Sequence, residues 1–164
     1  MSELVVLVVE DEPEVRDALV RDLQPLAASV RIEVADDAED AEAVVREVAE
    51  AGDVLGLVLA DHRLPGRTGV DLLVDLAEDP DHVGVTRKVL VTGQADHADT
   101  IRAVNEAGLD HYIAKPWDAE ELRAVARAAL TDAVLDAGLD PLPFVADLDG
   151  PRLLEAYRRR ASDR

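Results

Sequence analysis

The chain contains no cysteine, and both aromatic residues and lysines are scarce. The absence of cysteine excludes disulfides, thiolate zinc sites and thiol nucleophiles. Ala, Val and Leu supply most of the hydrophobic content of 48%, against one Trp, one Phe and two Tyr, so the core must be aliphatic. Lys88 and Lys115 are the only lysines, which makes a lysine at a crevice position conspicuous.

Basic charge is also in short supply. The chain has 17 Lys and Arg residues against 36 Asp and Glu residues, a net charge of −19. Phosphate backbones repel such a chain, so we expect no direct binding to nucleic acid. The imbalance is uneven, because residues 141–164 hold five Arg against four acids, or +1, which leaves −20 for residues 1–140.

No targeting segment is evident in the sequence. The first residues, Met1-Ser2-Glu3, offer no positively charged region, and the apolar run that follows is far too short to span a bilayer. We therefore expect a cytoplasmic protein with no membrane partner. A length of 164 residues fits one domain plus a modest extension.

Apolar, mostly β-branched runs alternate five times with helix-like patterns. The runs predict strands at 4–9, 30–35, 54–60, 87–92 and 111–114. The patterns that follow them predict helices at about 13–24, 38–51, 70–78, 97–107 and 118–133. Five such units with right-handed crossovers predict an α/β fold with a doubly wound, five-stranded parallel sheet, helices on both faces and the flavodoxin-like strand order 2-1-3-4-5.

The alternation stops after about residue 134. Gly138 to Pro143 breaks the helical pattern, and Pro151 opens a short amphipathic, Arg-rich helix. We predict a domain at 1–133 and a C-terminal extension at 134–164, which is too short to form a separate output domain. The extension either folds back on the acidic domain, docks on a partner or is a frayed terminus.

Carboxylates follow two of the predicted strands directly. Glu10 and Asp11 follow the first strand, and Asp61 follows the third. The predicted strand order places these two strand ends side by side at the switch point, where ligands bind in such sheets. Three neighbouring acids cannot all remain charged without a cation between them. The pattern therefore predicts a divalent metal site, with chemistry on one of the carboxylates.

Three further features lie at strand ends. They are the loop Leu64-Pro65-Gly66 after the third strand, Thr92 with Gly93 after the fourth, and Lys115 with Pro116 after the fifth. Taken in this order with the acids, they resemble the response-regulator receiver domain of two-component signalling. The resemblance covers residues 4 to about 132. Each element alone is common, whereas the ordered set is specific.

The resemblance implies that Asp61 is the phosphoacceptor. Its carboxylate would attack a phosphoryl group from a sensor histidine kinase or a small phosphodonor and form an aspartyl-phosphate. Mg²⁺ or Mn²⁺ would be held by Asp11, Asp61 and the backbone carbonyl of Arg63, with Glu10 acting through water. Glu10 stands where many relatives have Asp. Alternatively, Glu10 is simply an acid near the start of the first helix, where the helix dipole favours negative charge.

Lys115 and Thr92 would contact the phosphoryl oxygens, the first as a point charge and the second through its hydroxyl. The alternatives are a surface lysine and a β-branched strand residue. Such a protein would be no enzyme beyond self-catalysed phosphotransfer and dephosphorylation. Arg63 and Gln94, two residues after Asp61 and Thr92, occupy positions that can gate the attacking water.

A switch is also implied, in which Thr92 moves towards the phosphoryl group and Tyr112 turns inward behind it. A half-buried strand tyrosine without a switching role is the alternative. The histidines show no metal-ligand spacing, and we interpret all four as surface or loop residues that are not phosphoacceptors: His62, His82, His97 and His111.

The expected output is a downstream protein or a second copy, bound through the face formed by 97–107 and 118–133. A phosphorelay intermediate or phosphate sink would use the same site. A haloacid-dehalogenase-type hydrolase also uses an Asp nucleophile, but Glu10 occupies that position in Glu10-Asp11-Glu12. A flavodoxin would need a phosphate loop rich in Ser, Thr and Gly after the first strand, and this chain has none there.

Overall fold

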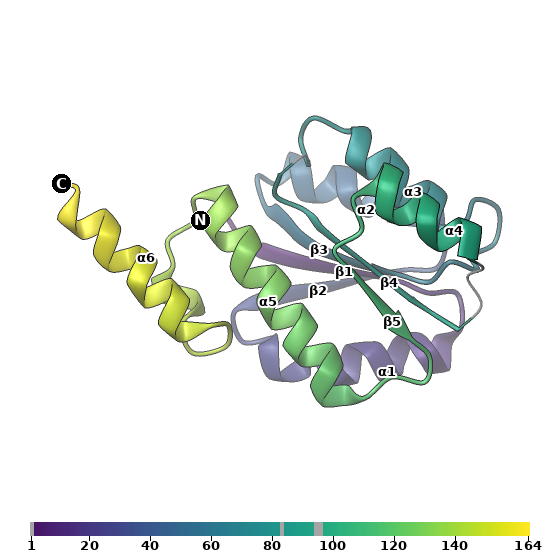
Figure 1. The fold of residues 1–164 in the computed structure, drawn as a ribbon, viewed down its shortest axis with the longest axis horizontal. Helices are drawn as coiled ribbons and strands as arrows, with labels where there is room; N and C mark the ends of the chain where they lie inside the picture. Colours follow the sequence, from purple (N-terminus) through teal and green to yellow (C-terminus); the bar gives the residue numbers. More distant parts are fainter. Residues whose placement is uncertain (1, 83, 94–96) are drawn as a thin grey trace.

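The computed structural model describes residues 2–82, 84–93 and 97–164. A 5-stranded parallel sheet in the order β2-β1-β3-β4-β5 runs through the centre (Figure 1). The strands are β1 (Leu4–Val9), β2 (Val30–Ala35), β3 (Val54–Ala60), β4 (Arg87–Thr92) and β5 (His111–Ala114). All five predicted strands and their order are confirmed.

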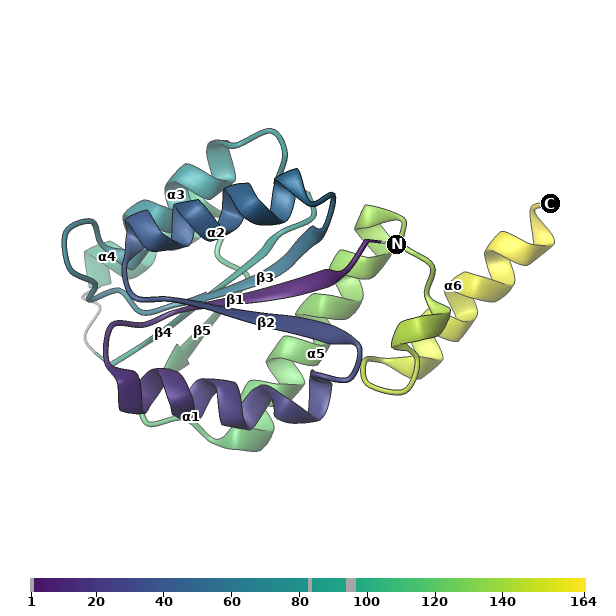
Figure 2. The same cartoon turned by 180° about the vertical axis from the view of Figure 1, so that it is seen from behind.

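Helices cover both faces of the sheet, as predicted. One face carries α1 (Pro13–Leu23) and α5 (Ala119–Ala137), and the other carries α2 (Ala38–Glu50), α3 (Gly69–Glu78) and α4 (His97–Arg102) (Figures 1 and 2). Shorter turns are η1 (Gln24–Leu26), η2 (Ala103–Ala107) and η3 (Leu142–Phe144), and the last helix is α6 (Gly150–Ser162). Within the described ranges, no helix combines the length and the apolar character that a bilayer crossing requires.

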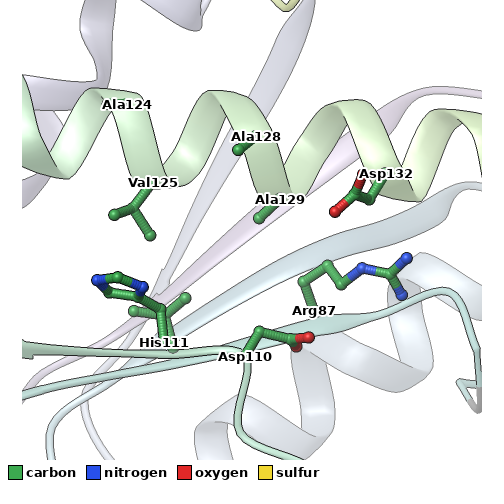
Figure 3. Close-up of a pocket in the computed structure, with 9 residues that line it drawn as sticks. Arg87, Asp110, His111, Ala124, Val125, Ala128, Ala129 and Asp132 are labelled. Carbon is green, nitrogen blue, oxygen red and sulfur yellow. The ribbon is translucent and has the colours of Figure 1, made fainter.

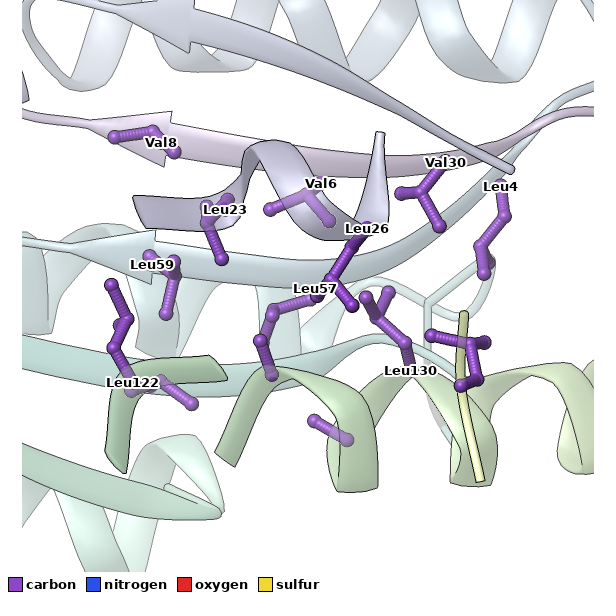
Figure 4. Packing of buried hydrophobic residues seen from close by; sticks show 14 of the residues in the cluster. Leu4, Val6, Val8, Leu23, Leu26, Val30, Leu57, Leu59, Leu122 and Leu130 are labelled. Atoms are coloured by element: carbon purple, nitrogen blue, oxygen red, sulfur yellow. The ribbon is translucent and has the colours of Figure 1, made fainter. Parts of the chain in front are cut away.

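Strand β1 is apolar at every position because both of its faces are covered. Leu4, Val6 and Val8 pack towards α1 and α5, whereas the alternate residues face α2 and α3. All of β1 is at most 1% exposed. Figure 4 shows Leu57 and Leu122 in the same cluster as the first three. Full burial of one such side chain contributes roughly 1.5–3 kcal/mol, so this strand is firmly held beneath the acids that follow it.

Two helices differ from the prediction. Helix α5 continues to Ala137 rather than ending near Ala133, because the apolar pattern persists and Val134 is fully buried. It stops at Gly138, whose φ of 69° suits a residue without a Cβ. The helix expected at 97–107 is α-helical only to Arg102 and then widens into the π-helical turn η2.

The C-terminal extension folds back on α5. Leu153 of α6 is fully buried, and with Phe144 and Leu148 it belongs to the core cluster of Leu4, Val6 and Val8 on the α1 and α5 side of the sheet. The backbone N–H of Asp149 donates to the Thr131 hydroxyl at 3.1 Å. The predicted boundary at 133 therefore falls inside α5, while the arginine-bearing end of α6 projects away from the sheet (Figure 1).

Candidate functional site

The three predicted acids meet at the carboxyl ends of β1 and β3. The backbone N–H of Asp61 donates to the carbonyl of Val9 at 3.0 Å, so the acids leave adjacent, hydrogen-bonded strands. Glu10, Asp11 and Asp61 each offer an oxygen, and these atoms lie within 4.8 Å of one another. Glu10 is fully buried and Asp61 is 6% exposed, whereas Asp11 is open to solvent.

Lys115 reaches into this cluster from the end of β5. Its ammonium donates to Glu10 Oε2 at 2.7 Å and to Asp61 Oδ2 at 2.9 Å. The Lys115–Pro116 peptide bond, whose isomer the sequence does not reveal, is cis. One ammonium against three carboxylates leaves two formal negative charges uncompensated, which suits a divalent cation with a preference for oxygen ligands.

The two buried acids have opposite electrostatic environments. Burial raises the pKa of Glu10, although hydrogen bonds from Lys115 and the backbone of Glu12 partly oppose it. Burial also acts to raise the pKa of Asp61, but hydrogen bonds from Lys115 and Thr92 outweigh it and hold this pKa below its ordinary value. Asp61 is therefore kept as a carboxylate at neutral pH, the form in which it can act as a nucleophile.

The carboxylates act on the lysine in return. Burial acts to lower the pKa of Lys115, but its hydrogen bonds to Glu10 and Asp61 prevail and raise it. Lys115 thus remains a cation in the crevice and is available to any anion that enters.

Thr92 and Tyr112 lie behind Asp61. Thr92 is buried at the end of β4, and its side chain hydrogen-bonds to Asp61. The Tyr112 hydroxyl donates to the backbone carbonyl of Thr92 at 3.0 Å. Its ring packs against the buried residues on the α2, α3 and α4 side of the sheet, which include Val5, Leu7 and Val9 and which we call the α2–α4 core cluster. The predicted switch pair is therefore in contact in this structure.

A cavity of about 470 Å³ opens over these residues. Its lining includes Asp61, Thr92 and Lys115, together with Arg63 and Trp117. The backbone N–H of Arg63 donates to Asp61 Oδ1 at 3.3 Å. The carbonyl role predicted for Arg63 stays a prediction, and Gln94 lies outside the described residues.

Sequence reasoning missed Gly69, which closes the loop that begins at Asp61. Its backbone N–H donates to the carbonyl of His62 at 2.9 Å. A Cβ on Gly69 would lie 1.9 Å from the backbone oxygen of Asp61, so only glycine fits. The available signal was a glycine at the first position of α3, directly after the N-cap Thr68.

Two histidines are more enclosed than the sequence indicates. His62 and His82 lie in loops, as predicted, yet both are buried. His62 Nε2 lies 3.0 Å from Asp99 Oδ2, and His82 Nδ1 lies 3.1 Å from the Thr86 hydroxyl. The contact between His62 and Asp99 joins residues far apart in the sequence, so no local pattern signals it, whereas His82 contacts Thr86 only four residues further on.

A doubly wound sheet with acids and a lysine at its switch point defines an α/β protein with its ligand crevice at the carboxyl ends of the strands. A family model described as the response regulator receiver domain matches residues 6–127. The chain therefore belongs to the response regulator receiver family, the phosphorylation-activated switches of two-component signalling.

Curated relatives agree with this assignment. The transcriptional regulatory protein AruR of Pseudomonas aeruginosa is 36% identical over 159 residues, which cover 96% of this chain and 62% of AruR. The hydrogenase transcriptional regulatory protein HoxA of Cupriavidus necator is 32% identical over 160 residues, which cover 97% of this chain and 30% of HoxA. The chain thus spans less than two thirds of the length of either relative.

Solved structures share the fold. The signal receiver domain of an HD domain-containing protein from Pseudomonas fluorescens Pf-5 has a TM-score of 0.72 and 26% identity, and the match covers 84% of this chain and 94% of that one. A CheY-like response regulator receiver domain protein from Methanospirillum hungatei has a TM-score of 0.68 and 26% identity, with coverage of 80% and 97%.

Proposed function

We propose that this domain receives a phosphoryl group on Asp61 and uses it to alter a protein-binding face. The observation that carries the proposal is the contact of Lys115 with both Glu10 and Asp61 at the junction of β1 and β3. It places a nucleophilic carboxylate and a fixed cation at one crevice, which is what phosphoryl transfer needs most from a protein.

In the proposed reaction, an Asp61 carboxylate oxygen forms a bond to phosphorus as the bond between phosphorus and the donor breaks. The donor atom, a histidine nitrogen of the kinase or an oxygen of a small phosphodonor, leaves with the bonding electron pair. Lys115 then exchanges a carboxylate partner for a phosphoryl oxygen, and the Thr92 hydroxyl donates to another. The domain catalyses this transfer on itself and, in our proposal, is otherwise not an enzyme.

A divalent ion fits the donor set. Asp11, Asp61 and the backbone carbonyl of Arg63 would hold Mg²⁺ or Mn²⁺, with Glu10 acting through water. The fit follows from clustered hard oxygens around the fully buried Glu10, whose pairing with Lys115 still leaves the cluster negative. Such an ion supplies charge neutralisation between the attacking carboxylate and the incoming phosphoryl group.

The proposed output face combines α4, η2, β5 and α5. Ile101 and Val104 are 46% and 53% exposed there. A groove of about 400 Å³ lies between α5 and the start of β4 and β5 (Figure 3). Its lining combines small apolar side chains such as Ala128 and Ala129 with the charged side chains of Arg87 and Asp132. We propose that a downstream protein or a second copy binds this face.

The remaining partners follow from charge and from the family. A sensor histidine kinase is the proposed phosphodonor, and the proposed location is the cytoplasm. With a net charge of −19, the domain itself has no proposed contact with nucleic acid.

The test is intact-mass measurement after incubation with acetyl phosphate and Mg²⁺. We expect one phosphoryl group on the wild type and none on Asp61→Asn. Asp17→Asn, which removes an exposed acid of α1, is the matched control and should label like the wild type. Equal labelling of wild type and Asp61→Asn would exclude Asp61 as the acceptor.

A further inference from the structure

Helix α4 begins without any apolar anchor. None of the side chains of His97–Arg102 is buried. Buried residues appear only in the π-helical turn that follows, where Ala103 and Ala107 enter the α2–α4 core cluster. The position of the first turns of α4 is therefore not fixed by the hydrophobic burial that fixes the other helices.

Two polar contacts join this part of α4 to the segment that carries Asp61. His62 Nε2 lies 3.0 Å from Asp99 Oδ2, and Arg102 Nη1 donates to Asp71 Oδ1 at 2.6 Å. Asp99 and Arg102 are three residues apart and hence lie on the same side of the helix. We call these two contacts the α4 latch.

The anchoring side of the latch is held in place. The side chain of His62 is only 10% exposed, and its backbone carbonyl accepts the Gly69 hydrogen bond. Its Nδ1 atom is buried with no hydrogen-bond partner among the described residues, so the contact with Asp99 is the polar interaction that orients the ring. Asp71 is fixed in turn by the capping box that it forms with Thr68.

We propose that the α4 latch holds the start of α4 in its unphosphorylated position and that releasing it favours the phosphorylated form. His62 follows Asp61 directly, so a shift of the β3–α3 loop at the acceptor alters the geometry of the latch without an intermediate residue. The turns that are released contain no buried side chain, and η2 provides irregular backbone at which they can pivot. His62 is thus a positioning residue for α4. The regulatory consequence rests on the proposed function, whereas the latch itself does not.

The latch is tested first in the protein without phosphodonor. Hydrogen exchange of the amides in 97–102 is compared for wild type, His62→Leu, Asp99→Ala and the double variant. We expect each single variant to speed exchange by about fivefold, and the double variant to go no further than Asp99→Ala, because the contact with His62 is already lost in that variant. His97→Leu, an exposed histidine of α4, is the matched control. Unchanged exchange in the single variants, or effects that add in the double variant, would overturn the latch.

Its regulatory role is tested with beryllium fluoride, which mimics a phosphoryl group on a carboxylate, in the presence of Mg²⁺. We expect Asp99→Ala to bind it about fivefold more tightly than the wild type, since less free energy opposes the shift. Arg102→Gln, which breaks the second contact, should act in the same direction and replaces His62→Leu should that variant fail to fold. Unchanged or weaker binding would overturn the regulatory role. Failure of the wild type to bind, with altered exchange in the variants, would reject the proposed function and leave the latch standing.

Discussion

The Tyr112 hydroxyl donates a hydrogen bond to the backbone carbonyl of Thr92 at 3.0 Å. Thr92 is also the residue whose side chain hydrogen-bonds to Asp61. A change at the acceptor therefore reaches β5 through one intervening residue. If Thr92 moves towards a phosphoryl group, the tyrosine ring loses or remakes this bond, and the surface around β5 changes with it.

Tyr112→Phe removes the hydrogen bond and keeps the ring. We expect a loss of about 1 kcal/mol in the free energy of unfolding, because one neutral hydrogen bond is lost. Asp61 should still be phosphorylated, but this phosphorylation should change the binding of a partner to the proposed output face less than in the wild type. Urea denaturation and intact mass measure the first two quantities. A variant that no longer accepts phosphate would place Tyr112 in the transfer step instead.

Lys115→Met should slow labelling by acetyl phosphate by about 100-fold or more, since a fixed cation no longer stabilises the developing charge. A time course of intact mass measures this effect. Lys88→Met is the control for lysine loss elsewhere and should label at the wild-type rate. Wild-type labelling of Lys115→Met would mean that the metal ion alone suffices for transfer.

Mg²⁺ should stabilise the folded protein through the acid cluster. At a free concentration 100 times the dissociation constant, we expect about 2.7 kcal/mol in the free energy of unfolding. Asp11→Asn should lose most of this gain, and a chelator should abolish both the gain and the labelling by acetyl phosphate. Thermal unfolding with and without Mg²⁺ provides the measurement. Equal stabilisation of the Asp11→Asn variant would show that the ion binds elsewhere.

Gly69→Ala should destabilise the fold by about 2–3 kcal/mol, because the added methyl group collides with the Asp61 backbone and forces the loop apart. Labelling of Asp61 should fall as well, since the nucleophile is displaced. Gly93→Ala is the matched control, because its Cβ would meet Lys115 at an ordinary contact distance of 3.7 Å. Urea denaturation of both variants measures the difference. Equal free energies of unfolding would contradict the collision at Gly69.

Lys88 should make the free energy of unfolding depend on pH in the alkaline range. Burial lowers the pKa of this lysine, although the nearby charge of Asp110 opposes the shift, and its ammonium donates a hydrogen bond to the carbonyl of Thr86 at 3.3 Å. Between the folded pKa and the unfolded value of about 10.4, the unfolded chain binds more protons, so stability contributed by this group rises with pH.

Lys88→Met should therefore be more stable than the wild type at pH 7, by about 1.4 kcal/mol for each unit by which the folded pKa is lowered. The advantage should shrink as the pH rises towards 10. Denaturation curves across that range measure it. A constant difference between the two proteins would show that the lysine stays protonated or neutral in both states.

The sheet could be predicted because β1 and β3 are buried on both faces, which leaves continuous apolar runs with sharp ends. The acids, Thr92 and Lys115 could be predicted to converge because the carboxyl ends of parallel strands share one edge. Helix ends are set more by tertiary packing. The apolar pattern of α5 persists past Ala133, but the cluster that buries Val134 there includes Leu153, which is far along the chain.

The contact between His62 and Asp99 was hidden for a similar reason. A histidine after the third strand is predicted to be a polar loop residue, and an aspartate in a short helix is predicted to be an exposed charge. The two meet only because β4 and α4 return the chain to the end of β3. The π-helical turn at Ala103–Ala107 is likewise a product of packing against α3 rather than of a local signal.

The position of Leu153 settles a question of access. This side chain packs α6 into the core cluster that contains Leu4, at the amino ends of the strands, whereas the acids lie at the carboxyl ends (Figure 2). A kinase bound over Asp61 and a molecule bound to Arg158 or Arg159 would approach the domain from opposite ends. In the proposed function, a partner bound at the arginine-bearing end of α6 would therefore leave the crevice over Asp61 open.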